Sequence, residues 1–186
     1  MGPIELLKEA HLLFVNGNFK ESVEVFTKAI EAGADPYIAY LSRGAANLKA
    51  DAADQSIHDF TQALVANSQS ARAYFFRGSV YMMKEEFEKA VSDFTKALEL
   101  KTDYAMAKFS RSVAYARMNM IEEASKDMMA IIPQMEQNLQ SFADSHGIIR
   151  TQLFKVMAQL EGERQWLTLN LSEKEMSTLK KWLEKE

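Results

Sequence analysis

The sequence contains no cysteine and only three histidines among its 186 residues. Without cysteine the chain cannot form disulfide bridges, thiolate nucleophiles or cysteine-ligated zinc sites, and this is compatible with a reducing compartment. The seven glycines occur in no phosphate-binding array such as GxGxxG. These absences remove many of the groups on which catalysis depends, and we expect neither an enzyme nor a bound cofactor or metal.

Excess positive charge and long apolar runs are also missing. The chain has 22 basic and 26 acidic residues, a net charge of −4. Nucleic-acid binding requires a basic surface that neutralises phosphates, so we expect no nucleic-acid partner. The first residues, MGPIELLKEAHLLF, interleave charged and apolar side chains, which predicts no secretory signal. No apolar run is long enough for a membrane span, and a cytoplasmic location is expected.

The sequence does have an internal repeat with a fixed interval of 34 residues. Three segments have nearly the same sequence pattern and predict the same kind of helix: ESVEVFTKAIEA, QSIHDFTQALVA and EKAVSDFTKALEL. Two series of positions follow this interval: Phe26, Phe60 and Phe94 with Ala29, Ala63 and Ala97; and, out of phase with these, Ala10, Gly44, Gly78 and Ser112. A fixed interval of this size is typical of a stacked-repeat architecture.

Each repeat unit predicts two helices. In the third unit, Tyr74, Gly78 and Tyr81 share one face of a helix predicted over residues 71–83, and the polar break 84–86 precedes a second helix. Glycine in mid-helix costs about 1 kcal/mol relative to alanine. Gly44 and Gly78 therefore predict a close approach of another helix, with Phe60 and Phe94 filling the space between units.

In order along the third unit, Tyr74, Gly78, Tyr81, Ala90, Phe94 and Ala97 resemble the signature of the tetratricopeptide repeat. The resemblance covers residues 3–138. It implies an all-α fold, a right-handed α-solenoid of stacked helix-turn-helix repeats over 3–36, 37–70, 71–104 and 105–138, the last degenerate. One departure from the family is the absence of its usual proline near the end of the second helix, which leaves the turns between repeats open.

A helical extension is predicted over residues 139–186, after the repeats end. The segment 147–167 is amphipathic, and we expect it to cap the last repeat. Ser172 and Glu175 form a capping-box pattern before a last helix over 172–185, in which Met176, Leu179, Trp182 and Leu183 share a side. This helix is equally compatible with a packed cap, a guest in a groove of the same or another copy, and a loose tail.

In the family that the chain resembles, the first helix of each repeat lines a concave groove. By phase, the resemblance implies a peptide-binding groove that is mostly apolar, with adaptable methionines. Its residues are Leu7, His11, Phe14, Leu41, Ala45, Leu48, Arg72, Phe75, Met82, Met83, Met106, Phe109, Val113 and Arg117. An apolar groove favours an amphipathic helix as its ligand.

The function implied is protein–protein interaction, as a scaffold or adaptor that holds a helical or extended peptide. Family members that bind the acidic tails of chaperones use a clamp of basic and amide side chains. At those places this chain has Leu7, His11, Ser42, Arg72 and Phe76. Only Arg72 fits, so we do not expect a chaperone tail as partner. The alternative is a structural or assembly protein that self-associates through its C-terminal helix or its groove, for example as a homodimer. His58 and Asp59 are interpreted as solvated surface residues rather than a catalytic or metal pair.

Overall fold

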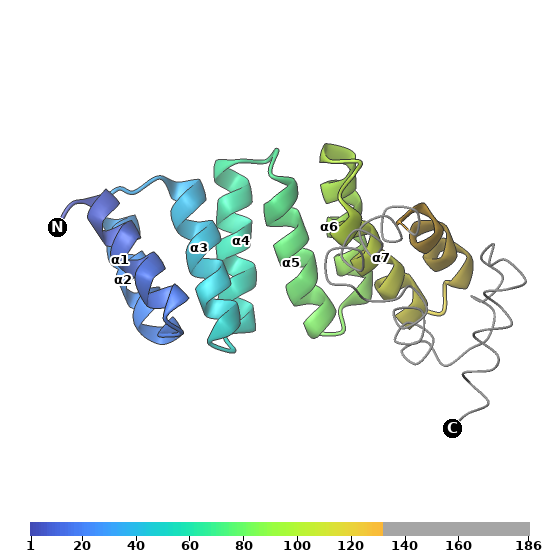
Figure 1. Cartoon of the computed structure of the whole chain (residues 1–186), viewed down its shortest axis with the longest axis horizontal. Helices are drawn as coiled ribbons and strands as arrows, with labels where there is room; N and C mark the ends of the chain where they lie inside the picture. Colours follow the sequence, from blue (N-terminus) through green and yellow to red (C-terminus); the bar gives the residue numbers. More distant parts are fainter. Residues whose placement is uncertain (132–186) are drawn as a thin grey trace, which may run out of the picture. The chain divides into compact units, whose positions relative to one another are not determined.

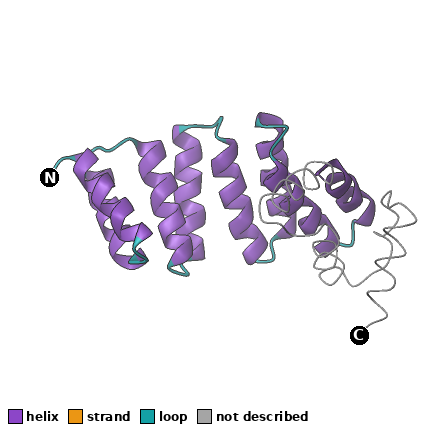
Figure 2. Cartoon of the chain, in the orientation of Figure 1, coloured by secondary structure: helices purple, strands orange, loops and turns teal. Residues whose placement is uncertain are grey.

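The computed structural model describes residues 1–131, which lie in one compact unit of helices with no strand among them (Figure 2). Seven helices are complete: α1 (Pro3–Val15), α2 (Phe19–Glu31), α3 (Pro36–Lys49), α4 (Ala53–Ala66), α5 (Ala71–Met83), α6 (Phe87–Leu100) and α7 (Ala105–Arg117). Residues 121–131 are helical up to the end of the described part. The bounds of α5 are those predicted from its spacing.

The helices pack as successive antiparallel pairs that stand side by side in chain order (Figure 1). Each helix packs on the one before and the one after it. The first helices of the pairs also contact one another, α1 with α3, α3 with α5 and α5 with α7. A single pair cannot bury its own apolar face, so stacking makes the core continuous. The prediction of an all-α solenoid is confirmed.

The core is built around one phenylalanine in each second helix. Phe26, Phe60 and Phe94 are fully buried. A Cβ atom placed on Gly44 would lie 2.8 Å from the Phe60 ring, and one on Gly78 would lie 2.8 Å from the Phe94 ring. Any larger residue would therefore overlap the ring. The mid-helix glycines serve close packing, as the sequence predicts.

Within each pair, the turn places one residue in the left-handed backbone region. These residues also follow the 34-residue interval: Gly17, Asp51, Glu85 and Asn119, with φ angles of 83°, 59°, 59° and 61°. Only the first is glycine, which enters this region without a steric penalty. Four different residue types therefore adopt the same backbone conformation at this place, so the turn geometry does not depend on one residue type.

The turns between pairs lack the family's proline and close in two ways. After α2, Gly33 takes a φ of +83°, and Pro36 begins α3. After α4 and α6 the chain becomes extended, at Asn67 and Lys101, with φ angles of −145° and −144°. Both turn conformations lead into a complete helix, so the repeats stack without the family's proline.

Several predictions fall outside the described residues. These are the boundary at residue 138, the helical extension over 139–186 and its segments 147–167 and 172–185. Part of the fourth repeat is within the described range, and there Ile131, which replaces the usual alanine, is buried.

Candidate functional site

Apolar side chains remain exposed mainly on the first helices of the pairs. Ile4, Leu12, Val15, Ile38, Met83, Met106 and Phe109 lie on α1, α3, α5 and α7 and are each at least 41% exposed. On the second helices α2, α4 and α6, only Val65 is a large apolar residue with comparable exposure. We call the exposed side of the first helices, except for Leu12, the inner surface. Leu12 belongs to a different face of α1, described below.

The predicted groove residues divide into three groups by exposure. Exposed are His11, Arg72, Met83, Met106, Phe109 and Arg117. Half-buried are Leu7, Phe14, Ala45, Leu48, Phe75, Met82 and Val113. Leu41 is buried, with 8% of its surface exposed.

Several of these residues help to hold the fold together. Leu41 packs with Phe60 in the core, so it offers a partner little surface. Leu7 and Phe14 pack against the cluster of buried residues around Phe26. Phe75 lies with its ring centre 5.0 Å from that of Tyr104 and 5.8 Å from that of Phe94. The more open part of the predicted groove is thus formed by α5 and α7.

Sequence reasoning missed three exposed residues of the inner surface, Ile4, Val15 and Ile38. A signal for them was present in the 34-residue interval. Ile4 and Ile38 occupy the places of Arg72 and Met106, and Val15 occupies that of Met83. Since the fold repeats at the same interval, every one of these positions faces the same side of its helix.

The polar groups of the inner surface are partly engaged with one another. His11 lies with Nε2 3.0 Å from the Ser42 hydroxyl and Nδ1 2.7 Å from the Leu7 carbonyl oxygen. Arg117 donates to Glu85 at 3.3 Å. Arg72 stacks over the Phe76 ring, 5.3 Å from its centre, and forms no ion pair within residues 1–131. Arg72 is therefore the cation best placed to meet an incoming acidic or carbonyl group.

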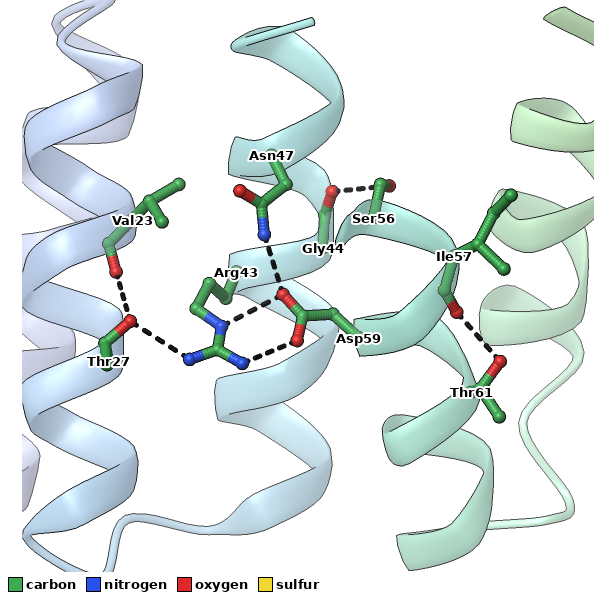
Figure 3. Close-up of polar contacts among 9 residues, drawn as sticks. All are labelled: Val23, Thr27, Arg43, Gly44, Asn47, Ser56, Ile57, Asp59 and Thr61. Atoms are coloured by element: carbon green, nitrogen blue, oxygen red, sulfur yellow. Dashed lines mark hydrogen bonds and ion pairs between the residues drawn. The ribbon is translucent and has the colours of Figure 1, made fainter. Parts of the chain in front are cut away.

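A second polar system, between the repeats, was not predicted. The Arg43 guanidinium donates through Nε and Nη2 to the two Asp59 carboxylate oxygens at 2.9 and 2.7 Å, and through Nη1 to Thr27 at 3.0 Å (Figure 3). Asn47 also donates to Asp59, at 2.8 Å. One arginine thereby links α2, α3 and α4, the second helix of one repeat and both helices of the next.

The same arrangement recurs at the next two junctions. Arg77 bonds Asp93 and Thr61, and Arg111 bonds Asp127 and Thr95, with donor–acceptor distances of 2.6–3.1 Å. In each case the hydrogen bond to the aspartate, opposed by burial, raises the pKa of the arginine. The nine residues keep the 34-residue interval in the sequence, so the signal that revealed the core could also have found them.

Asp59 corrects one sequence prediction. His58 is exposed, as expected, but Asp59 is only 1% exposed and is fully occupied by Arg43 and Asn47. The interpretation of both as solvated is wrong for Asp59. A buried carboxylate is stable only where charged and polar donors satisfy it, and these lie on a different helix, which adjacent positions in the sequence do not reveal.

Within the described residues, no cluster of three or more histidine, aspartate and glutamate side chains could hold a metal ion. Among the same residues, no helix combines the length and the apolar character that crossing a membrane requires.

Comparison with known families and structures agrees with the repeat architecture. Two models of the tetratricopeptide repeat match, one over residues 71–104 and the other over residues 7–57. A comparison with the sequences of curated proteins found no match.

Several solved structures share the fold. A crystal structure of MamA protein is 25% identical, with a TM-score of 0.68 over 74% of this chain and 75% of that one. MamA from Desulfovibrio magneticus RS-1, residue 41 to the end, is 21% identical, with a TM-score of 0.68 over 73% and 76% of the two chains. The second TPR of Spaghetti (RPAP3), bound to the HSP90 peptide SRMEEVD, is 24% identical, with a TM-score of 0.51 over 52% and 90%.

The 34-residue interval, the paired helices with their glycine–phenylalanine contacts, and the two family matches agree with one another. They identify the chain as a tetratricopeptide-repeat protein.

Proposed function

We propose that this protein is a scaffold or adaptor that binds another protein through the inner surface, and that its preferred ligand is an amphipathic helix. The observation that carries the proposal is the exposure of Met83, Met106 and Phe109 on α5 and α7. Exposed apolar side chains that lie on the same side of successive helices favour a site of interaction. A helical ligand would bury them with apolar residues at i, i+3, i+4 and i+7.

The chemistry of this surface favours shape and apolar contact over charge. Two of the exposed residues are methionines, whose unbranched side chains adapt to ligands of different shape. Arg72 supplies one cation for a polar group at the edge of the ligand. Each large side chain that becomes fully buried contributes about 1.5–3 kcal/mol before ordering costs. A few such anchors are sufficient for moderate affinity.

Tetratricopeptide repeats also bind acidic peptides, as in the Spaghetti repeats solved with an HSP90 peptide. For this chain we propose a different ligand. Of the clamp positions, His11 and Ser42 lie within hydrogen-bond distance of each other, and Leu7 and Phe76 are apolar. An acidic tail would find Arg72 alone, and one cation does not replace a clamp. We further propose a non-enzymatic role in the cytoplasm.

The proposal is tested with a display library of helical peptides selected on the full chain. We expect the selected peptides to carry apolar residues at helical spacing. Combining Met106→Asp with Phe109→Asp should weaken their binding at least tenfold, because two anchors lose apolar contact. The matched control combines Val65→Asp with Ile121→Asp, two exposed positions outside the first helices, and should keep the affinity. Selection of acidic peptides instead, or equal binding by both double variants, would show the proposal to be wrong.

A further inference from the structure

The outer face of α1 corresponds to the side of α3, α5 and α7 that packs on the preceding repeat, but no described helix covers it. Leu12 is 62% exposed, whereas the residues at the same place in the later repeats, Ala46, Val80 and Ala114, are all fully buried. Two of them are shown packing against the preceding repeat, Ala46 with Phe26 and Val80 with Phe60. Leu12 therefore lies where a further second helix would pack.

The charge of this face also differs from that of the internal junctions. Glu9 occupies the place of Arg43, which donates to Thr27 of the preceding repeat. Glu5 occupies the place of Ala39, which is fully buried. Both glutamates are exposed. A helix that packs over Leu12 must then present a basic residue where the internal second helices present threonine, because a carboxylate needs a cationic partner on burial.

The sequence of this chain contains a segment with that pattern. In α2, Val23 and Phe26 pack in the cluster that includes Ala46 of the next repeat, and Thr27 accepts a hydrogen bond from Arg43. Ile30 has the place of Leu64, which packs with Ala73 and Val80 of the repeat that follows it. Residues 172–185 carry Met176, Leu179, Lys180 and Leu183 at the same intervals. The three apolar positions are kept, and Lys180 takes the place of the threonine. The change from threonine to Lys180 in this segment complements the change from arginine to Glu9 on α1, because lysine and glutamate carry opposite charges.

We propose that residues 172–185 of one copy of this protein dock on the outer face of α1 of a second copy, in place of a preceding repeat. Leu12 would be buried by Leu179, which takes the place of Phe26, and Lys180 would pair with Glu9. Glu5 would stay at the edge of the contact, exposed to water as it is in the single copy. Such a contact is head-to-tail, because the two surfaces differ and each copy has one of each. The chain would thus extend its own repeat stack from copy to copy, independently of the inner surface.

The test uses sedimentation velocity on the full chain over about a hundredfold range of concentration, since association follows mass action. We expect the full chain to form dimers and larger species as concentration rises. Glu9→Lys and Lys180→Glu should each raise the dissociation constant at least tenfold, because each places like charges in contact. Combining both substitutions in one chain restores the opposite charges and should restore association.

Mixing the two single variants separates docking between copies from docking within one chain. The lysine introduced by Glu9→Lys faces the glutamate introduced by Lys180→Glu only across two different molecules. The mixture should therefore form dimers at concentrations where each variant alone is monomeric. A mixture that associates no more than its components overturns the proposal, as does a full chain that stays monomeric throughout.

Leu12→Asp tests the apolar part of the contact with little risk to folding, because the side chain is largely exposed. It should weaken association at least tenfold. Val65→Asp, at a residue that is 77% exposed on α4, is the matched control and should not. The double variant Met106→Asp with Phe109→Asp should associate normally, which keeps this proposal distinct from ligand binding by the inner surface. Equal association by the Leu12 and Val65 variants overturns the proposal.

Discussion

Arg43 and Asp59 form a two-pronged ion pair across the helices of the second repeat, with Nε 2.9 Å from Oδ2 and Nη2 2.7 Å from Oδ1. The remaining guanidinium nitrogen, Nη1, donates to Thr27 of the first repeat at 3.0 Å. The pair therefore acts both within its own repeat and across the junction. In repeat proteins, stability is close to a sum of repeat terms and nearest-neighbour terms, and this side-chain set contributes to both.

Replacing Asp59 by alanine should strongly destabilise the protein. Asp59 is buried and accepts from both Arg43 and Asn47, so its loss leaves several donors without partners. Removing one member of a buried ion pair costs about 3–5 kcal/mol. Because 17% of the Arg43 side chain is accessible to water, we expect the lower end of that range. Urea unfolding followed by circular dichroism measures the change.

The matched control for Asp59 removes both members of the pair, as Arg43→Met with Asp59→Leu. With both charges gone, no unpaired ion is left, so the double variant should be more stable than Asp59→Ala. If the two variants were equally stable, the loss would come from packing and not from an unpaired charge.

Gly44→Ala should destabilise the protein, although alanine is the better helix former. The new Cβ would lie 2.8 Å from the Phe60 ring, which is fully buried, so the ring or the helix would have to shift. Overpacking costs about 1–3 kcal/mol, and helix propensity returns about 1 kcal/mol, so a net loss of about 1 kcal/mol is expected. Thermal unfolding of both proteins checks this.

The contact between Gly44 and Phe60 is tested by combining substitutions. In the background of Phe60→Leu, which removes the ring, Gly44→Ala should no longer destabilise and should gain from helix propensity. The same loss in both backgrounds would show that the ring is not the cause.

The sequence alone predicts the repeat, the helix pairs and the glycine–phenylalanine contacts because all of these follow one interval and strong residue preferences. Gly44 in mid-helix is unfavourable unless another helix needs its space, so it carries information about its neighbour. The exposure of Leu41 could not be predicted in this way. It shares the phase of Phe109, which is 41% exposed, yet it is buried in the core with Phe60. Side-chain packing in each repeat decides such differences.

The arginine links show a different limit. Arg43, Asp59 and Thr27 follow the interval, but charged residues in a helix are usually solvated, so their period does not by itself predict burial. The contact joins three helices, and only the packed repeats place the three side chains together. The polar break at 84–86 predicts where a turn lies, but the left-handed conformation of Asp51 and Glu85 could not be predicted, because residues other than glycine seldom adopt it.

Asp51→Gly should stabilise the protein. Asp51 has a φ of 59°, where a side chain costs free energy that glycine avoids. We expect a gain of up to about 1 kcal/mol, reduced by the greater freedom of glycine in the unfolded chain. The reverse change at the equivalent place, Gly17→Ala, should destabilise. A Cβ there meets no atom within 4 Å, so its effect comes from the backbone alone. Urea unfolding midpoints that moved in the same direction in both variants would contradict this reasoning.

Phe75 and Phe109 occupy the same place in two repeats but should respond differently to alanine. Phe75 packs against Tyr104 and Phe94, so its truncation should cost about 2 kcal/mol, below the 3–5 kcal/mol of a fully buried phenylalanine. Phe109 is 41% exposed, and its loss should cost clearly less, about 0.5 kcal/mol. Chemical unfolding of the two variants distinguishes them, and equal losses would mean that Phe109 is also a core residue.

Ser22 and Ser56 form a matched pair, since both are fully buried at the same place in successive second helices. The Ser56 hydroxyl donates to the Gly44 carbonyl oxygen at 2.8 Å, whereas the Ser22 hydroxyl has no hydrogen-bond partner within the described residues. Ser56→Ala should therefore lose about 1 kcal/mol through the broken hydrogen bond. Ser22→Ala should be neutral or stabilising, because it removes a polar group that is buried without a partner.

The third repeat provides a natural control for this pair, because Ala90 stands at the equivalent place and is fully buried. Alanine therefore fits the space. Both substitutions gain the same helix propensity, so the difference between them reports the hydrogen bond. We expect Ser22→Ala to be more stable than Ser56→Ala by about 1 kcal/mol or more in urea unfolding. Equal stabilities would mean that the hydrogen bond from Ser56 to Gly44 makes no net contribution to the packing of α4 on α3.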